Sequence, residues 1–273
     1  MPHVTTDDGV DIFYKDWGTG QPIVFSHGWP LSADAWDPQM MYFLAHGYRV
    51  IAHDRRGHGR SEQVADGHDM DHYADDLAAL VRHLDLRDAI HVGHSTGGGE
   101  VARYLSRHGT ARASKAVLLS AVTPGLTRSE NNPHGQPVAM YDLFQQQVAE
   151  NRATAYRHAA IPFYGYDLPG VMPSHPVLDN HWRQAMMGSV KAHHDCIVAF
   201  SKTDFTADLP AIDVPALVLH GGADQVAPAR ITAERAAALL PDATLKIYPG
   251  FPHGMPIIKG AVIDPDLLEF FRD

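Results

Sequence analysis

Residues 93–97 read Gly-His-Ser-Thr-Gly, so a serine stands two positions from a glycine on either side. An apolar run at 89–92 precedes this segment and a helical pattern at 96–107 follows it, which predicts a strand, a sharp turn and a helix. Such a turn exposes the hydroxyl of its central serine, and glycines at this spacing prevent side-chain collisions. The pattern predicts that Ser95 is a nucleophile, with an incidental serine in a glycine-rich turn as the alternative.

A serine hydroxyl becomes a nucleophile when a base takes its proton, and a carboxylate orients that base. The chain has 19 histidines, so composition cannot select the base, but position along the chain can. Asp224 follows a predicted strand at 214–219, and His253 follows one at 244–248. Because loops at the carboxyl ends of parallel strands converge, the order Ser95, Asp224, His253 predicts a catalytic triad with His253 as the base and Asp224 as its orienting carboxylate.

Attack on a carbonyl makes a negatively charged oxygen, which fixed hydrogen-bond donors must stabilise. The backbone N–H of Thr96, next to the nucleophile, is the first expected donor, and the second should come from the loop after an earlier strand. That loop contains Gly28, Trp29 and Pro30. Proline has no N–H, so the N–H of Trp29 is the expected second donor of this oxyanion hole. His27 is expected to hold the loop by hydrogen bonding rather than to take part in the chemistry.

Other polar residues compete with these assignments. His220 lies at the end of its predicted strand and is expected to support the loop, whereas Asp213 precedes that strand and lies at the wrong end. The charged residues at 54–61 are expected to form a turn network that holds the next helix. Residues 193–195 read His-His-Asp, but no further ligand stands at a spacing typical of zinc, so no metal is predicted. Cys196, in an apolar run, is expected to be a buried structural thiol.

These residues need a scaffold that brings distant loops together. Segments with strand patterns, some apolar and others alternating, are interspersed with helical patterns along the chain. The predicted strands cover 10–16, 22–26, 48–52, 89–92, 116–119, 214–219 and 244–248. This alternation predicts an α/β fold with a mostly parallel, doubly wound sheet and helices on both faces. A segment at about 121–205 contains seven prolines and helical pieces. It is expected to be an insertion over the sheet, so residues 1–273 are predicted to form a single domain.

Composition argues against several classes of protein. The 273 residues carry a net charge of −10 without a basic stripe, so no nucleic-acid partner is expected. The longest hydrophobic run is six residues, far short of the roughly 20 that a membrane span needs, and no secretory signal is visible. The single cysteine permits no internal disulfide, which fits a cytoplasmic location. No nucleotide-binding glycine motif follows a strand, so no cofactor is predicted.

Taken together, the chain resembles the α/β-hydrolase fold family, and more closely its bacterial arylesterases and cofactor-free, non-haem chloroperoxidases or perhydrolases. The resemblance extends over essentially the whole chain. It is carried by Phe-Ser-His-Gly-Trp-Pro at 25–30, Asp-Arg-Arg-Gly-His-Gly-Arg-Ser at 54–61, Gly-His-Ser-Thr-Gly-Gly-Gly-Glu at 93–100, Pro-Phe-Tyr-Gly at 162–165, Thr-Asp-Phe at 203–205 and His-Gly-Gly-Ala-Asp-Gln-Val-Ala-Pro at 220–228.

The resemblance implies a serine esterase that hydrolyses small aryl and alkyl esters through an acyl-enzyme and uses hydrogen peroxide in place of water as a secondary activity. A lactonase or lactamase on the same triad, and peracid formation as the main activity, are alternatives. Family members often form trimers or hexamers, so a homo-oligomer is expected. By analogy, a helical cap inserted after the sixth strand shapes a substrate pocket, expected to be lined by Trp29, Val122, Phe163, Phe200, Val226 and Met255, any of which is otherwise plain core.

Two other classes of function do not fit the sequence. A binding protein on a hydrolase scaffold would lack a triad residue, but all three are present here. A haem or vanadate halogenase would need an axial ligand or a basic anion cage, and neither can be placed in the sequence. Peroxide use has a local explanation, because Pro30 restricts the backbone of Trp29 and so the direction of the Trp29 carbonyl, which would accept a hydrogen bond from peroxide. The alternative is that Pro30 only stiffens a surface turn.

Overall fold

The computed structural model describes all 273 residues and contains one eight-stranded sheet. Its strands are β1 (His3–Thr5), β2 (Asp11–Trp17), β3 (Pro22–Ser26), β4 (Arg49–His53), β5 (Ala89–His94), β6 (Ala113–Leu119), β7 (Ala216–Gly221) and β8 (Ala243–Tyr248). Their order is β1-β2-β4-β3-β5-β6-β7-β8. β2 pairs antiparallel with both β1 and β4, and all other neighbours are parallel. The predicted α/β fold with a mostly parallel sheet is confirmed.

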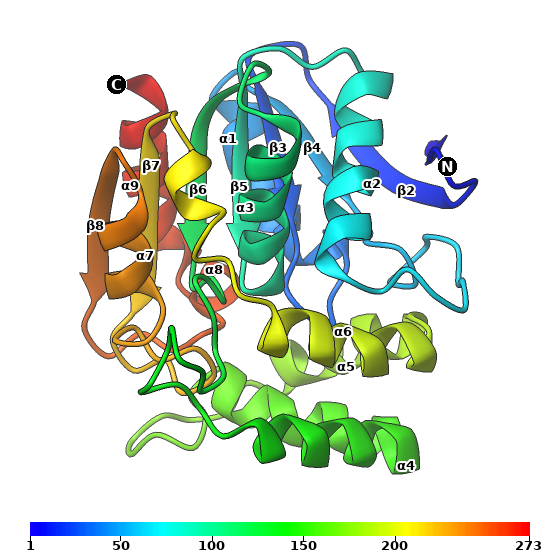
Figure 1. The fold of residues 1–273 in the computed structure, drawn as a ribbon, viewed down its shortest axis with the longest axis vertical. Coiled ribbons are helices and arrows are strands. Elements are labelled where there is room, and N and C mark those ends of the chain that lie inside the picture. The colour runs from blue at the N-terminus through cyan, green and yellow to red at the C-terminus, as the bar shows by residue number, and fades with distance from the viewer.

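Helices cover both faces of the sheet, with α2 and α3 on one face and α1 and α9 on the other (Figure 1). The helices are η1 (Ala33–Trp36), α1 (Asp37–Ala45), α2 (Met70–His83), α3 (Thr96–His108), α4 (Val138–Phe163), α5 (His175–Met187), α6 (Val190–Lys202), η2 (Leu209–Ala211), α7 (Ala233–Leu239), α8 (Met255–Ile258) and α9 (Gly260–Arg272). None combines the length and apolar character needed to span a bilayer.

The central strands are apolar on both sides, as strands covered by helices on two faces must be. Ile23 and Phe25 of β3 pack into the core that α1 and α9 cover, while Val24 between them packs into the core that α2 and α3 cover. Successive side chains of a strand point to opposite faces, so this burial pattern fixes the register. The parallel strands therefore end at one common edge of the sheet.

The segment between β6 and β7 lies across that edge, at the bottom of Figure 1. It contains α4, α5 and α6, and α4 packs against both of the others. We refer to these three helices as the cap. α4 is interrupted at Asn151, whose φ of −157° and ψ of 83° are not helical. The cap follows the sixth strand along the chain, as expected, and falls within the predicted insertion at 121–205.

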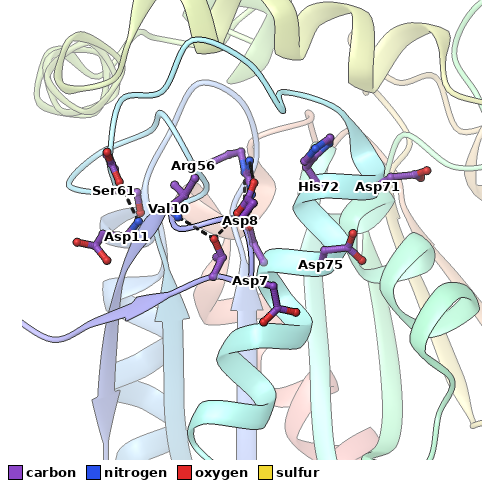
Figure 2. Close-up of polar contacts among 12 residues, drawn as sticks. Asp7, Asp8, Val10, Asp11, Arg56, Ser61, Asp71, His72 and Asp75 are labelled. Atoms are coloured by element: carbon purple, nitrogen blue, oxygen red, sulfur yellow. Dashed lines mark hydrogen bonds and ion pairs between the residues drawn. The ribbon is translucent and has the colours of Figure 1, made fainter.

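Charged residues after β4 hold the loops of this edge. Asp54 accepts hydrogen bonds from the Ala33 N–H at 2.6 Å and the Arg60 N–H at 2.7 Å. Arg56 donates to Asp76 of α2 at 2.7 Å. It also donates to Asp8 of the β1–β2 turn at 2.9 Å, and Figure 2 shows these two side chains. The predicted turn network is confirmed, and it also joins α2 to the first hairpin. Strand β1 was not predicted, because its three residues, of which one is buried, are too few for an alternating pattern to stand out.

Candidate active site

Ser95 stands at the sharp turn between β5 and α3. Its φ of 56° and ψ of −119° lie in a region that residues with a side chain rarely adopt. The flanking glycines have a steric reason: a Cβ on Gly93 would lie 2.3 Å from the Gly97 oxygen, and one on Gly97 would lie 2.1 Å from the Ser26 oxygen. The turn fits only with glycine at both positions, and it projects the serine hydroxyl from the sheet edge toward the cap.

The loops after β7 and β8 bring Asp224 and His253 to this serine. Nε2 of His253 lies 2.9 Å from the Ser95 Oγ, and Nδ1 of the same ring lies 2.7 Å from Oδ2 of Asp224. A carboxylate only accepts hydrogen bonds, so Nδ1 carries the proton and Nε2 is free to accept the serine proton. Ser95 is 5% exposed and His253 is fully buried. The arrangement is that of a nucleophile, a base and an orienting carboxylate.

Asp224 is held by backbone and side-chain donors. Its Oδ1 accepts hydrogen bonds from the N–H groups of Val226 and Ala227 at 2.9 and 2.8 Å. Its Oδ2 lies 3.1 Å from Nε2 of His220 as well as facing His253. Burial alone would raise the pKa of Asp224, but the two facing histidines outweigh it and hold that pKa well below its ordinary value. His220 thus contacts the carboxylate and does not replace His253, in line with the supporting role expected for it.

His94 is a supporting residue that sequence reasoning did not single out. Its Nε2 lies 3.0 Å from the carbonyl oxygen of His253, and the two rings lie 5.1 Å apart. Burial, together with the nearby His253, lowers the pKa of His94 to about 3, so its ring is a neutral donor to that carbonyl. The only sequence signal was its place beside Ser95 in the turn.

Two backbone donors flank the serine. Thr96 is the first residue of α3, so its N–H has no acceptor within the helix. The N–H of Trp29, in the loop after β3, has no acceptor elsewhere in the protein.

The indole of Trp29 donates to the carbonyl of His193 in α6 at 3.0 Å, which ties the loop to the cap. The Trp29 carbonyl receives no hydrogen bond, so it is available to a bound molecule.

A cavity of about 320 Å³ opens beside Ser95 and His253, between the sheet edge and the cap. Five of the six expected lining residues surround it: Trp29, Val122, Phe163, Phe200 and Val226. No lysine, arginine, aspartate or glutamate lines it. Sequence reasoning missed the part of the wall that the first turns of α4 supply, formed by Met140, Tyr141, Leu143 and Phe144. The cavity is therefore suited to an uncharged, apolar ligand.

Met255 is a correction to the expected lining. Although it follows His253 by two residues, it begins α8 and turns away from the cavity. Its side chain is fully buried among residues of α1 and α9, such as Met40 and Ile263, on the opposite side of the loop. The start of α8 sets this direction, which the spacing from His253 does not reveal.

The residues considered for metal binding are not brought together. His193 is buried with Nδ1 2.7 Å from the Tyr156 hydroxyl, whereas His194 pairs with Asp195 at the surface. No three histidine, cysteine, aspartate or glutamate side chains are grouped so that they could hold a metal ion. Burial raises the pKa of the Cys196 thiol to about 11, so this cysteine stays protonated, as a structural thiol does.

Comparison with known proteins agrees with this geometry. A family model described as the alpha/beta hydrolase fold matches residues 21–259. The chain is 57% identical to a non-heme haloperoxidase of Rhodococcus erythropolis and 56% identical to a bifunctional esterase/perhydrolase of Acinetobacter calcoaceticus, in both cases over the full length of both chains. The fold matches the crystal structure of a bromoperoxidase from Bacillus anthracis with a TM-score of 0.96 and 35% identity, covering 100% of this chain and 99% of that one.

Proposed function

Because the chain belongs to the alpha/beta hydrolase fold family, we propose that it is a serine esterase that cleaves small aryl and alkyl esters through an acyl-enzyme on Ser95. One observation carries this proposal: Asp224, His253 and Ser95 form a continuous hydrogen-bonded chain at the floor of an apolar cavity. The esterase/perhydrolase name of a relative that is 56% identical over its whole length supports the same activity.

In the first half of the reaction the ester loses its alcohol. The Ser95 Oγ attacks the ester carbonyl while Nε2 of His253 takes the hydroxyl proton, and Asp224 stabilises the imidazolium that forms. The carbonyl oxygen becomes an oxyanion, which accepts hydrogen bonds from the N–H groups of Trp29 and Thr96. The bond to the alcohol oxygen then breaks, and His253 returns its proton to that oxygen. The acyl group stays on Ser95.

In the second half an acceptor removes the acyl group. His253 takes a proton from water as the water oxygen attacks the acyl carbonyl, and the acid leaves when Ser95 regains its proton. Hydrogen peroxide serves as a second acceptor, so a peracid leaves instead of the acid. The free carbonyl of Trp29 supports this step, since it can accept the additional O–H of peroxide. The peracid oxidises bromide or chloride in solution, and the halide needs no site on the protein.

The proposal is tested by labelling Ser95. A fluorophosphonate should attach to Ser95, as mass spectrometry of the digested protein would show, and abolish hydrolysis of p-nitrophenyl acetate. Ser95→Ala should lower kcat by about 10⁴- to 10⁶-fold. A label on another residue, or full activity in Ser95→Ala, would overturn the assignment. A panel of acetate to octanoate esters that includes lactones separates the esterase from the lactonase alternative.

Oligomeric state and location belong to the same proposal. We expect a trimer or hexamer in solution, by resemblance to the family, and sedimentation equilibrium measures it directly. We expect a cytoplasmic location, because the one cysteine is a buried free thiol and forms no disulfide.

A further inference from the structure

We infer that Arg55, held by Glu100, is a positioning residue for the oxyanion hole. The two expected oxyanion donors come from different parts of the fold: Thr96 begins α3, and Trp29 lies in the loop after β3. Their separation must be fixed if both are to reach one oxygen atom. A buried chain of hydrogen bonds runs from α3 to that loop through Arg55. The inference rests on the proposed function, because it concerns the oxyanion that forms on Ser95.

The first link joins α3 to Arg55. Glu100 lies one helical turn after Thr96, and its Oε2 accepts hydrogen bonds from Nε and Nη2 of Arg55 at 2.8 and 2.5 Å. Its Oε1 faces Nε2 of His53 at 2.6 Å and the Ser26 hydroxyl at 3.2 Å. Burial would raise the pKa of Glu100, but the facing Arg55 outweighs it and the pKa falls to about 2. The carboxylate is charged at neutral pH, so the pair is ionic.

The second link joins Arg55 to His27. Nη2 of Arg55 donates to the carbonyl oxygen of His27 at 2.7 Å, and the backbone N–H of Arg55 donates to Nε2 of the His27 ring at 3.0 Å. Because Nε2 accepts, Nδ1 of His27 carries the proton. It donates to the carbonyl oxygen of Gly28 at 2.9 Å. Burial and the Arg55 cation lower the pKa of His27 well below its ordinary value, which keeps the ring in this neutral form.

The third link is covalent. The carbonyl of Gly28 and the N–H of Trp29 belong to the same peptide group, which is trans. In a trans peptide group the C=O and N–H point in opposite directions. The hydrogen bonds that Gly28 receives from His27 and from the Leu31 N–H at 3.0 Å therefore also aim the Trp29 N–H. The chain Glu100–Arg55–His27–Gly28 sets one oxyanion donor relative to the helix that carries the other.

The cost of this arrangement argues that it does more than stabilise the fold. Arg55 and Glu100 are 1% and 0% exposed, and burying two charges costs nearly as much as their attraction returns. In addition, Nη1 of Arg55 is buried without an acceptor, which is unfavourable. Apolar side chains of similar size would stabilise the fold at least as well. They could not hold the His27 carbonyl, so the loop position accounts for the pair.

The neighbouring residue supplies a matched control. Arg56 is 2% exposed and pairs with Asp76, which is 3% exposed, through hydrogen bonds of 2.7 and 2.5 Å. Like Arg55 with Glu100, this is a buried arginine–carboxylate pair, although Arg56 also pairs with the more exposed Asp8. Arg56 joins α2 through Asp76 and the β1–β2 turn through Asp8, and neither side chain of the pair makes a hydrogen bond to the loop after β3 that carries Trp29. Breaking it should reduce stability without moving the Trp29 N–H.

The experiment compares Arg55→Lys and Glu100→Gln with Arg56→Lys and Asp76→Asn. For each full-length variant, kcat and KM are measured with p-nitrophenyl acetate, and the melting temperature is recorded. The affinity for a phenylboronic acid is also measured, because its adduct on the serine places an oxygen in the oxyanion hole. We expect kcat and boronate affinity to fall together by about 10- to 100-fold in the first pair, less than the loss of an entire oxyanion donor. KM should change less than threefold, and the control pair should keep wild-type kcat.

The proposal is overturned if both pairs lower kcat equally at an equal loss of melting temperature, or if only KM changes. Glu100→Asp keeps the charge but withdraws it from Arg55, so it should give an intermediate kcat. It replaces Glu100→Gln in the comparison if that variant does not fold. Failure of the esterase proposal is distinguishable, because the wild-type protein itself would then hydrolyse no ester and carry no fluorophosphonate label on Ser95.

Discussion

Nε2 of His220 lies 3.1 Å from Oδ2 of Asp224, the same carboxylate oxygen that faces Nδ1 of His253 at 2.7 Å. His220 Nε2 also lies 2.6 Å from the carbonyl oxygen of Ala227. Since both neighbours of this nitrogen are acceptors, it carries the proton, which it donates to the nearer Ala227 carbonyl while also facing the carboxylate. His220 thus faces one oxygen of Asp224 together with His253, while the backbone donors hold the other oxygen.

Replacing Asp224 by asparagine should lower kcat by up to about 10⁴-fold, because an amide no longer stabilises the imidazolium or fixes the Nδ1–H form of His253. His220→Asn should cost only about 10-fold, since it removes a supporting donor and leaves the backbone N–H groups of Val226 and Ala227 in place. Both variants are compared by steady-state hydrolysis of p-nitrophenyl acetate. An equal loss of kcat in the two variants would show that His220 is as important to the reaction as Asp224 and does more than support it.

Peroxide-dependent halogenation should require a carboxylic acid. If the acyl-enzyme on Ser95 passes its acyl group to peroxide, acetate must first acylate the serine, and peracetic acid is the oxidant that leaves. Bromination of monochlorodimedone should therefore be rapid in acetate buffer and lost in a phosphate buffer without any carboxylate. Ser95→Ala should abolish the bromination in acetate buffer. Equal rates in the two buffers would rule out the peracid route.

The mouth of the cavity should set the preference for acyl-chain length. Leu143 of α4 lines the cavity and is 54% exposed, so its substitution does not disturb the core. Leu143→Glu should lower kcat/KM for octanoate esters by about tenfold, because a long chain would meet a charge there, while acetate esters should react as before. Met41→Glu adds the same charge at an exposed site away from the cavity and serves as the control. A similar loss for acetate and octanoate would contradict this placement of the long chain.

Asp264 should reduce stability as the pH rises. Burial raises its pKa to about 6, although the Gln39 side chain donates to it at 3.1 Å. An acid with a raised pKa holds its proton more tightly in the folded state, so stability falls as the pH rises from about 4 to about 6 and stays lower above that range. Asp264→Asn should therefore melt at a higher temperature than the wild type at pH 8, and this advantage should disappear at pH 4.

Asp266 on the same helix provides a control of opposite sign. Burial opposes the shift, but the Lys246 ammonium lowers the pKa of Asp266 below its ordinary value, so its contribution is present above about pH 4 and is lost in acid. Asp266→Asn should lower the melting temperature at pH 8 and have no effect at the acid end. Parallel pH curves for the Asp264 variant and the wild type would contradict the prediction for Asp264.

The chemistry of the site was readable from the sequence because local constraints specify it. Two glycines flanking Ser95 suit few structures other than a sharp turn. The reason is steric, because a Cβ on Gly93 would collide with the Gly97 backbone oxygen and a Cβ on Gly97 with that of Ser26. The order of Asp224 and His253 after two predicted strands placed them at one edge of the sheet, since parallel strands end together. Continuous apolar runs predicted the buried strands for the same local reason.

Tertiary packing decided the rest. The α4 wall of the cavity, the direction of Met255 and the bonds of His220 and Arg55 all depend on contacts between residues far apart in the chain. A local pattern predicts that a helix forms, but the rotation of that helix about its axis is set by the surface against which it packs. The contact of His220 with the same carboxylate oxygen that faces His253 was therefore settled only when β7 and β8 placed their loops side by side.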